Sequence, residues 1–219
     1  MGKPLSKARA MIIAVDGPAA SGKGTVARAL ASHFGLPHLD TGLLYRAVAL
    51  NLLRWGGDPE SEFAAARAAN FSQIDFADPE LKSEAVGGLA SRISVYPLVR
   101  EALIERQRSF ALQAGGAVLD GRDIGTVIAP DADVKLFVTA RIEVRAARRS
   151  EELKRLGRLA GYEDVLIDIQ ARDARDSNRT TAPLAQAQDA ILLDTSDMAI
   201  GTAVQRAVTL VEAQIERSA

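Results

Sequence analysis

The sequence predicts an α/β protein with one five-stranded parallel sheet covered by helices on both faces. Five short runs of branched apolar residues occur, and each is followed by a stretch with helical character, which is the pattern of a parallel sheet buried on both faces. The chain of 219 residues, 47% hydrophobic and 25% charged, is also long enough to bury a full core. The five runs lie at residues 12–15, 36–39, 117–120, 134–138 and 190–194.

A glycine-rich turn separates the first apolar run from a helical stretch at 26–31. Gly17 and Gly22 can adopt backbone angles that point several N–H groups at one anion, and the helix adds its positive N-terminal end. Lys23 can reach a terminal phosphate, and the Thr25 hydroxyl can meet a magnesium ion. The spacing Gly-x4-Gly-Lys is the P-loop pattern and predicts a site for ATP and Mg²⁺; a turn that only caps the helix is the weaker interpretation. The predicted nucleotide-binding residues here are Gly17, Pro18, Ala19, Ala20, Ser21, Gly22, Lys23, Gly24 and Thr25, with Thr25 as the metal ligand.

The second apolar run leads into a helix expected over 43–53, with Asp40 or Thr41 as its cap. Open α/β sheets bind ligands at the carboxyl ends of their strands, so Thr41 and Arg46 lie where a ligand is expected. For Arg46 alone, a solvated helix residue is the better interpretation.

The middle of the chain, at 56–95, has weaker patterns and is interpreted as an inserted, mobile segment with a helix at 61–69. A periodic helix begins at Pro97 and is expected to end at Gly115-Gly116. The last helix is expected over about 200–215.

The formal net charge is −1, so nothing global directs the protein to nucleic acid or an acidic membrane. One local excess is formed by Arg141, Arg145 and Arg148 or Arg149, which recur at the spacing of one helix face. Several cations on one face repel one another and gain from meeting an anion. A solvated basic helix is the equal alternative.

A second arginine-rich stretch contains Arg172, Asp176 and Arg179 at spacings of four and three, which predict a shared helix face. A surface ion-pair ladder would explain it. A ligand with phosphate and hydroxyl groups would explain it too, because Arg binds phosphate through two hydrogen bonds and Asp accepts from a hydroxyl.

The composition excludes several functions. With no cysteine there is no disulfide framework and no cysteine nucleophile, and the two histidines, His33 and His38, are interpreted as structural. No guanine-recognition motif Asn-Lys-x-Asp supports a GTPase. No apolar run could span a bilayer, residues 1–10 lack the apolar centre of a secretory signal, and the myristoylation-like pattern Met1-Gly2 with Ser6 is taken as chance, so a cytoplasmic location is expected.

Seven motifs follow one another in order from Ile12 to about Ser196. They are GPAASGKGT from Gly17, DTGLLYR from Asp40, YPLVREAL from Tyr96, LDGRDIGTV from Leu119, ARIEVRAARR from Ala140, RDARDSNRTTAPL from Arg172 and LDTS from Leu193. This order resembles the cytidylate kinase family of the bacterial type. The resemblance implies a three-layer P-loop kinase fold and Mg²⁺-dependent transfer of the ATP γ-phosphoryl group to CMP or dCMP. It also implies a monomer.

The resemblance further implies a core at about 11–40, 96–147 and 171–219, a monophosphate-binding arm at about 41–95 and a mobile lid at about 148–170. The arm departs from the family between Asp75 and Val86, which is short for the usual inserted β-hairpins. By resemblance Arg145 would bind ATP, and Lys23, Arg122, Arg148 and Arg179 would be catalytic. The substrate-binding residues would be Arg46, Arg122 and Arg179 with Thr41 at the CMP phosphate, Ser91, Arg100 and Asp123 at the cytosine, and Arg172 and Asp176 at the sugar.

Two other functions stay open on the residues alone. One is a P-loop kinase for another nucleoside monophosphate or a small metabolite, in which Asp40 or Asp123 could serve as a base for a hydroxyl acceptor. The other is a non-catalytic nucleotide-binding protein that regulates a partner.

Overall fold

The computed structural model describes residues 11–71, 75–158 and 160–218, and the expectations for residues 1–10 lie outside this range. Its strands form one sheet in the order β2-β3-β1-β4-β5, with every pairing parallel. The predicted five-stranded parallel sheet is therefore confirmed. The strands are β1 (Met11–Asp16), β2 (His38–Asp40), β3 (Gly116–Gly121), β4 (Val134–Thr139) and β5 (Ile191–Asp194).

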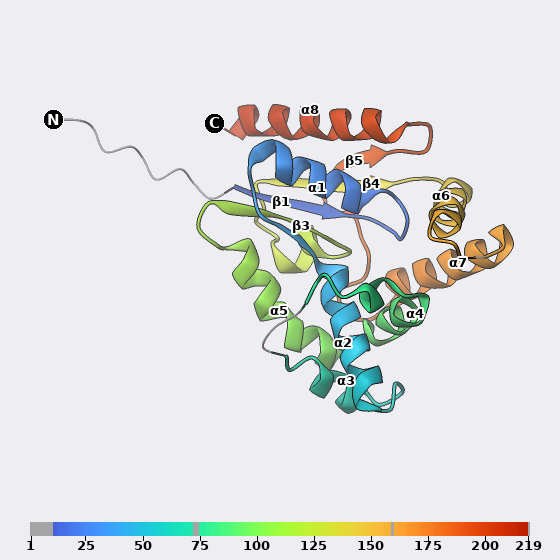
Figure 1. The fold of residues 1–219 in the computed structure, drawn as a ribbon. Coiled ribbons are helices and arrows are strands. Elements are labelled where there is room, and N and C mark those ends of the chain that lie inside the picture. The colour runs from blue at the N-terminus through green and yellow to red at the C-terminus, as the bar shows by residue number, and fades with distance from the viewer. Residues whose placement is uncertain (1–10, 72–74, 159, 219) are drawn as a thin grey trace.

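Helices cover both faces of the sheet, as Figure 1 shows, with α1 and α8 on one face and α2 and α5 on the other. Successive side chains of a strand point to opposite faces. Ile13 and Val15 of β1 accordingly join the core under α1 and α8, while Ala14 joins the core under α2 and α5. The predicted three-layer arrangement is confirmed. The covering helices are α1 (Lys23–Phe34), α2 (Thr41–Trp55), α5 (Pro97–Ala111) and α8 (Ile200–Ser218).

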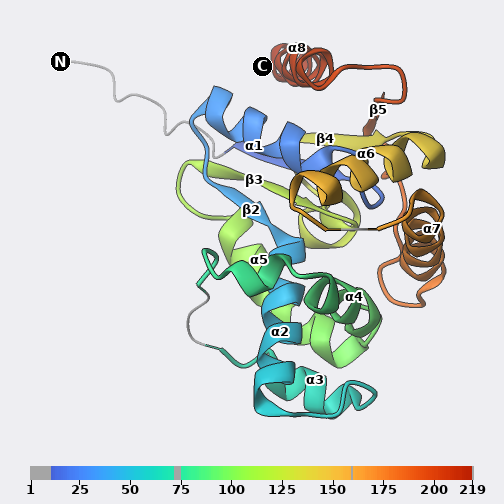
Figure 2. The same cartoon turned by 45° about the vertical axis from the view of Figure 1, so that its right-hand side comes forward.

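Further helices follow β2 and β4 in the chain. Two of them, α6 and α7, share a small core of their own, and Figures 1 and 2 both place α4 on the same side of the molecule as this pair. The segment 75–95 contains no strand, as its shortness suggested. These elements are α3 (Glu62–Ala68), the short turn η1 (Pro79–Lys82), α4 (Glu84–Ile93), the turn η2 (Ile124–Ile128), α6 (Ile142–Arg155) and α7 (Tyr162–Asn178).

One local expectation about a helix end is wrong: α5 ends at Ala111, its last buried residue, rather than at Gly115-Gly116. The expected cap of α2 is confirmed in its position, because Asp40 is the N-cap residue, but the Asp40 side chain makes no capping hydrogen bond. Instead, the Thr41 hydroxyl donates to the carbonyl oxygen of Asp120 at 2.8 Å, which ties the start of α2 to the end of β3.

Candidate active site

The turn between β1 and α1 has the backbone conformation that its glycines predict. Gly17 has a φ of +155°, and a Cβ there would lie 2.0 Å from the carbonyl oxygen of Val138, so a larger residue does not fit. Gly22 has a φ of +90°, and its carbonyl oxygen accepts from the backbone N–H groups of Thr25 at 3.0 Å and Val26 at 3.1 Å. The first turn of α1 therefore follows the loop without a break, so the N-terminal end of the helix lies at the loop, as an anion site requires.

A cavity of about 340 Å³, which we call the P-loop cavity, is lined by residues 19–25 of this turn together with Asp40, Arg46, Asp120 and Arg122, among others. Burial, and then the like charge of Arg122, lower the pKa of Lys23 to about 8, against the opposing charges of Asp120 and Asp40. The Lys23 ammonium thus has too little negative charge around it to compensate for its desolvation. A bound phosphate would supply that charge.

A second cavity, of about 130 Å³, is lined by five arginines and two aspartates, and we call it the arginine cavity. This excess of positive charge suits a ligand with a phosphate group. The residues come from α2, α4, α5, the turn after β3, α7 and the segment after α7. All nine residues predicted to bind the acceptor line this one cavity: Thr41, Arg46, Ser91, Arg100, Arg122, Asp123, Arg172, Asp176 and Arg179.

Asp123 lies between two buried guanidinium groups. Nη2 of Arg100 donates to one of its carboxylate oxygens, and Nη2 of Arg179 lies 3.3 Å from the other. Burial and the nearby charge of Arg100 lower the pKa of Arg179. Because each carboxylate oxygen of Asp123 has its own arginine partner, the carboxylate has a defined orientation within the cavity.

α7 supplies Arg172 and Asp176, but the helix ends at Asn178 and Arg179 has an extended backbone. The prediction that Arg179 shares their helix face is therefore wrong; Arg179 is instead held by the carbonyl oxygen of Ala182, which accepts from its Nε at 2.5 Å. Asp176 accepts from Nε of Arg122 at 2.7 Å.

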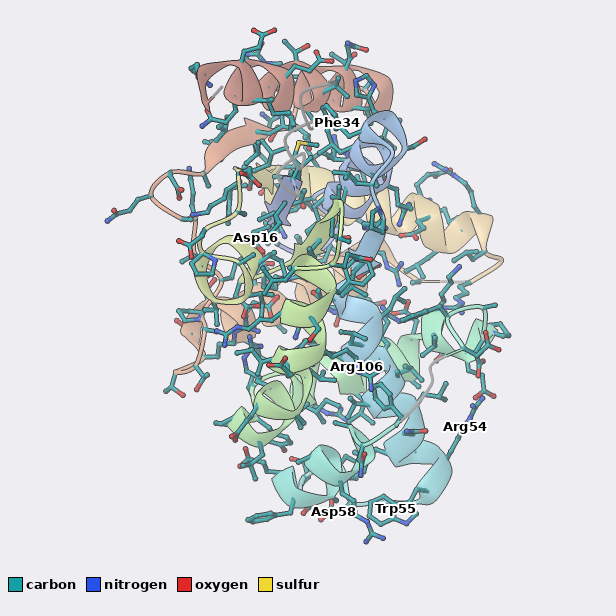
Figure 3. The ribbon with its side chains drawn as sticks, turned by 90° about the vertical axis from the view of Figure 1, so that its left-hand side faces the viewer. Asp16, Phe34, Arg54, Trp55, Asp58 and Arg106 are labelled. Carbon is teal, nitrogen blue, oxygen red and sulfur yellow. The ribbon has the colours of Figure 1, made fainter. Side chains whose placement is uncertain are left out.

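Two residues with structural roles at this site were not predicted. Asp16, at the end of β1 and near the middle of the molecule in Figure 3, accepts from the backbone N–H groups of Ile124 at 2.8 Å and Gly125 at 2.7 Å. It thereby fixes the turn that carries Asp123, and burial raises its pKa to about 6. Gly87 leaves room for Arg46, because a Cβ there would lie 2.7 Å from Nη2 of Arg46.

The arginines at the start of α6 do not form one free cationic helix face, because Arg141 and Arg145 are already paired with carboxylates. Arg141 precedes the helix and forms an ion pair with Asp197 at 2.6 Å. Arg145 is buried and donates through both terminal nitrogens to Asp173, at 3.1 and 2.6 Å. It also donates to the carbonyl oxygen of Ala19 at 3.1 Å, so it supports the P-loop turn from the side of α6.

Arg148 and Arg149 are neighbours in sequence but lie in different surroundings. Arg148 donates to the hydroxyl of Thr195 at 2.9 Å and to its carbonyl oxygen at 2.6 Å. It lines a third cavity, of about 690 Å³, beside the P-loop turn, with Met198 and other apolar residues. Arg149 lines both this cavity and the P-loop cavity.

Both histidines pair with carboxylates and line none of these three cavities. Nε2 of His38 lies 2.7 Å from Oδ1 of Asp120, and Nε2 of His33 lies 3.1 Å from Oε1 of Glu212. In the described part of the chain, no three His, Cys, Asp or Glu side chains are grouped so as to hold a metal ion. Among the described helices, none has the length and apolar character to cross a membrane.

Known proteins resemble this chain along nearly its whole length. The family model described as cytidylate kinase matches residues 13–213. A cytidylate kinase of Rhodopseudomonas palustris is 56% identical over 93% of this chain and 96% of its own length, and one of Methylocella silvestris is 54% identical over 92% and 94%. A solved structure of an uncharacterized protein from Eubacterium ventriosum shares the fold, with a TM-score of 0.57, 17% identity and coverage of 94% of this chain and 99% of that one. The family match and the two close relatives lead to one conclusion: the chain belongs to the cytidylate kinase family.

Proposed function

We propose that this protein transfers the γ-phosphoryl group of ATP to CMP and dCMP. The observation that supports this most directly is the shared boundary of two cavities. Arg46, Arg122 and Arg172 line both the P-loop cavity and the arginine cavity. A triphosphate in the first and a monophosphate in the second would therefore bring their phosphates together, with cations between them.

The donor would occupy the P-loop cavity, with its phosphates on residues 17–25. Lys23 would bind the terminal phosphates, and the pKa of its ammonium would rise again on contact with them. Thr25 would hold Mg²⁺, which would neutralise phosphate charge. The third cavity, with its apolar lining beside Arg148, would accommodate the adenosine part. Arg145 would act on ATP indirectly, through the P-loop turn that it supports.

The acceptor would occupy the arginine cavity. Arg46, Arg122 and Arg179 with Thr41 would hold its phosphate, which would compete with Asp176 for the guanidinium of Arg122. Ser91, Arg100 and Asp123 would face the cytosine, and Arg172 and Asp176 would face the sugar. Asp123 would accept from the cytosine amino group, and uracil has an oxygen at that position.

These groups would suffice for the chemistry without a protein base. The acceptor phosphate oxygen is already largely anionic at neutral pH, so the reaction requires positioning and charge stabilisation. The cations Lys23, Arg122 and Arg179 would stabilise the charge that spreads over the transferring group. Arg149 is better placed than Arg148 to supply a further cation, because it lines the P-loop cavity and Arg148 does not.

We also propose the division of the chain into a core (11–40, 96–147 and 171–219), an arm (41–95) and a lid (148–170). Closure of the arm and the lid over both nucleotides would exclude water and prevent hydrolysis of ATP. The protein would act as a cytoplasmic monomer on small-molecule nucleotides, without nucleic-acid or membrane partners.

An acceptor panel tests this function. ADP release is measured by a coupled assay with ATP, Mg²⁺ and, in turn, CMP, dCMP, UMP, AMP and small alcohols. We expect CMP and dCMP to give the highest kcat/KM. Faster turnover with another acceptor would favour the alternative kinase. Slow hydrolysis that no acceptor stimulates would favour a regulatory nucleotide-binding protein.

A further inference from the structure

Glu84 connects the arm to the lid. It is the first residue of α4, directly after Ser83, whose hydroxyl accepts from the backbone N–H of Val86 and so fixes this end of the helix. One oxygen of the Glu84 carboxylate accepts from Nη2 of Arg149 and lies 3.6 Å from Nη1 of Arg158. Nη1 of Arg158 also lies 3.3 Å from the carbonyl oxygen of Lys82. The start of α4 thus contacts two lid arginines.

Arg149 is the lid arginine through which this contact reaches the reaction site. Its other terminal nitrogen donates to Glu152 of the same helix at 2.8 Å. Arg145 and Arg148 are bonded to the P-loop turn, to α7 and to the segment after β5. Among the described arginines of α6, Arg149 therefore stands out as the one that both touches the arm and lines the P-loop cavity.

The same turn of the arm also contacts the acceptor side. Nη1 of Arg46 donates to the carbonyl oxygen of Leu81 at 2.6 Å and to that of Ser83 at 3.3 Å. Arg46 lines the arginine cavity. The carbonyl groups of Leu81 and Ser83 thus hold Arg46, which is proposed to bind the acceptor phosphate. The next residue, Glu84, holds Arg149, which lines the P-loop cavity.

We infer that Glu84 is a positioning residue that places Arg149 over the transferring phosphoryl group when the arm is closed on the acceptor. This inference rests on the proposed function. Without the carboxylate, the remaining ion-pair partner of Arg149 among the described residues is Glu152, on its own helix, so the position of Arg149 no longer depends on the arm. The nucleotides keep their other contacts, so the loss falls on the chemical step rather than on binding.

The variant Glu84→Gln tests this role, with Glu80→Gln as the matched control. Glu80 lies in η1, just before α4, but pairs with Arg54 at 2.8 Å, within the arm. We expect Glu84→Gln to lower kcat roughly three- to tenfold with KM for ATP and CMP within about twofold of wild type. We expect Glu80→Gln to leave kcat unchanged. Thermal unfolding of both variants checks that the fold is kept.

A double-mutant cycle with Arg149→Lys shows whether Glu84 acts through Arg149. In the Arg149→Lys background, we expect adding Glu84→Gln to lower kcat by less than about twofold. The guanidinium group that Glu84 positions is already absent from that background. Equal kcat in Glu84→Gln and Glu80→Gln would overturn the inference, and so would fully multiplicative effects in the cycle. Failure of the proposed function would look different, because the wild-type protein itself would not phosphorylate CMP.

Discussion

Replacing Lys23 with methionine should stabilise the ligand-free protein at neutral pH. The pKa of the Lys23 ammonium is lowered from 10.5 to about 8, with burial as the largest cause. One pKa unit corresponds to about 1.4 kcal/mol, so keeping this ammonium charged costs the folded protein at most roughly 3 kcal/mol. Because the side chain is only half-buried, we expect Lys23→Met to raise the free energy of unfolding by about 1–2 kcal/mol. Methionine keeps the length of the side chain without its charge.

The stability difference between Lys23→Met and the wild-type protein should depend on pH. Between about pH 8 and 10.5 the unfolded lysine binds more protons than the folded one, so the wild-type protein gains stability as pH rises through this window. The advantage of Lys23→Met should therefore be full at pH 7 and shrink towards pH 10. Urea unfolding of the ligand-free proteins measures it, with the exposed Lys82→Met as control. A variant less stable than wild type at pH 7, or an advantage that does not change with pH, would refute the reasoning.

Three further predictions concern Asp123, Gly87 and Asp16. Asp123→Asn should narrow the kcat/KM preference for CMP over UMP by about tenfold, because its amide can donate to the uracil oxygen; an unchanged ratio would remove Asp123 from base recognition. Gly87→Ala should raise KM for CMP roughly tenfold by displacing Arg46, whereas Gly88→Ala, with no atom within 4 Å of its Cβ, should not. The pKa of Asp16 is raised from 3.8 to about 6. Between these pH values the folded protein therefore binds more protons than the unfolded chain. The free energy of unfolding should fall as pH rises through this window because of Asp16. Asp16→Asn should flatten this part of the pH–stability curve measured by urea unfolding, and an unaltered slope would contradict the assignment.

Local pattern predicted the sheet and the P-loop because their signals lie within short segments. β1 has an apolar run, Gly17 and Gly22 have the required positions, and α1 follows at once. Residue patterns suggested a ligand near Arg46 and near Arg172, but the specific role of each acceptor residue could be assigned only by family resemblance. These residues come from six separate parts of the chain, and nothing in the sequence around Ser91 or Arg100 indicates that the two line one cavity.

The residues that were missed act through contacts distant in sequence. Asp16 accepts from backbone groups more than 100 positions away, Gly87 is needed only because Arg46 passes beside it, and Glu84 meets Arg149 across 65 positions. The helix ends also depended on tertiary contacts: Arg179 leaves the helix pattern of α7 to reach Asp123 and Ala182. The exposed Trp55, at the end of the molecule opposite α8 in Figure 3, with Arg67 stacked on its ring at 4.5 Å, belongs to none of these contacts.

The central claim is that the γ-phosphoryl group passes from ATP to the phosphate of CMP. Incubation with CMP, Mg²⁺ and ATP labelled in its γ-phosphate, followed by chromatographic separation of the nucleotides, measures this transfer directly. We predict that the label appears in CDP at the rate at which ADP forms, and that Lys23→Met nearly abolishes it. Label that appears only in inorganic phosphate, or in another acceptor in preference to CMP, would contradict the account.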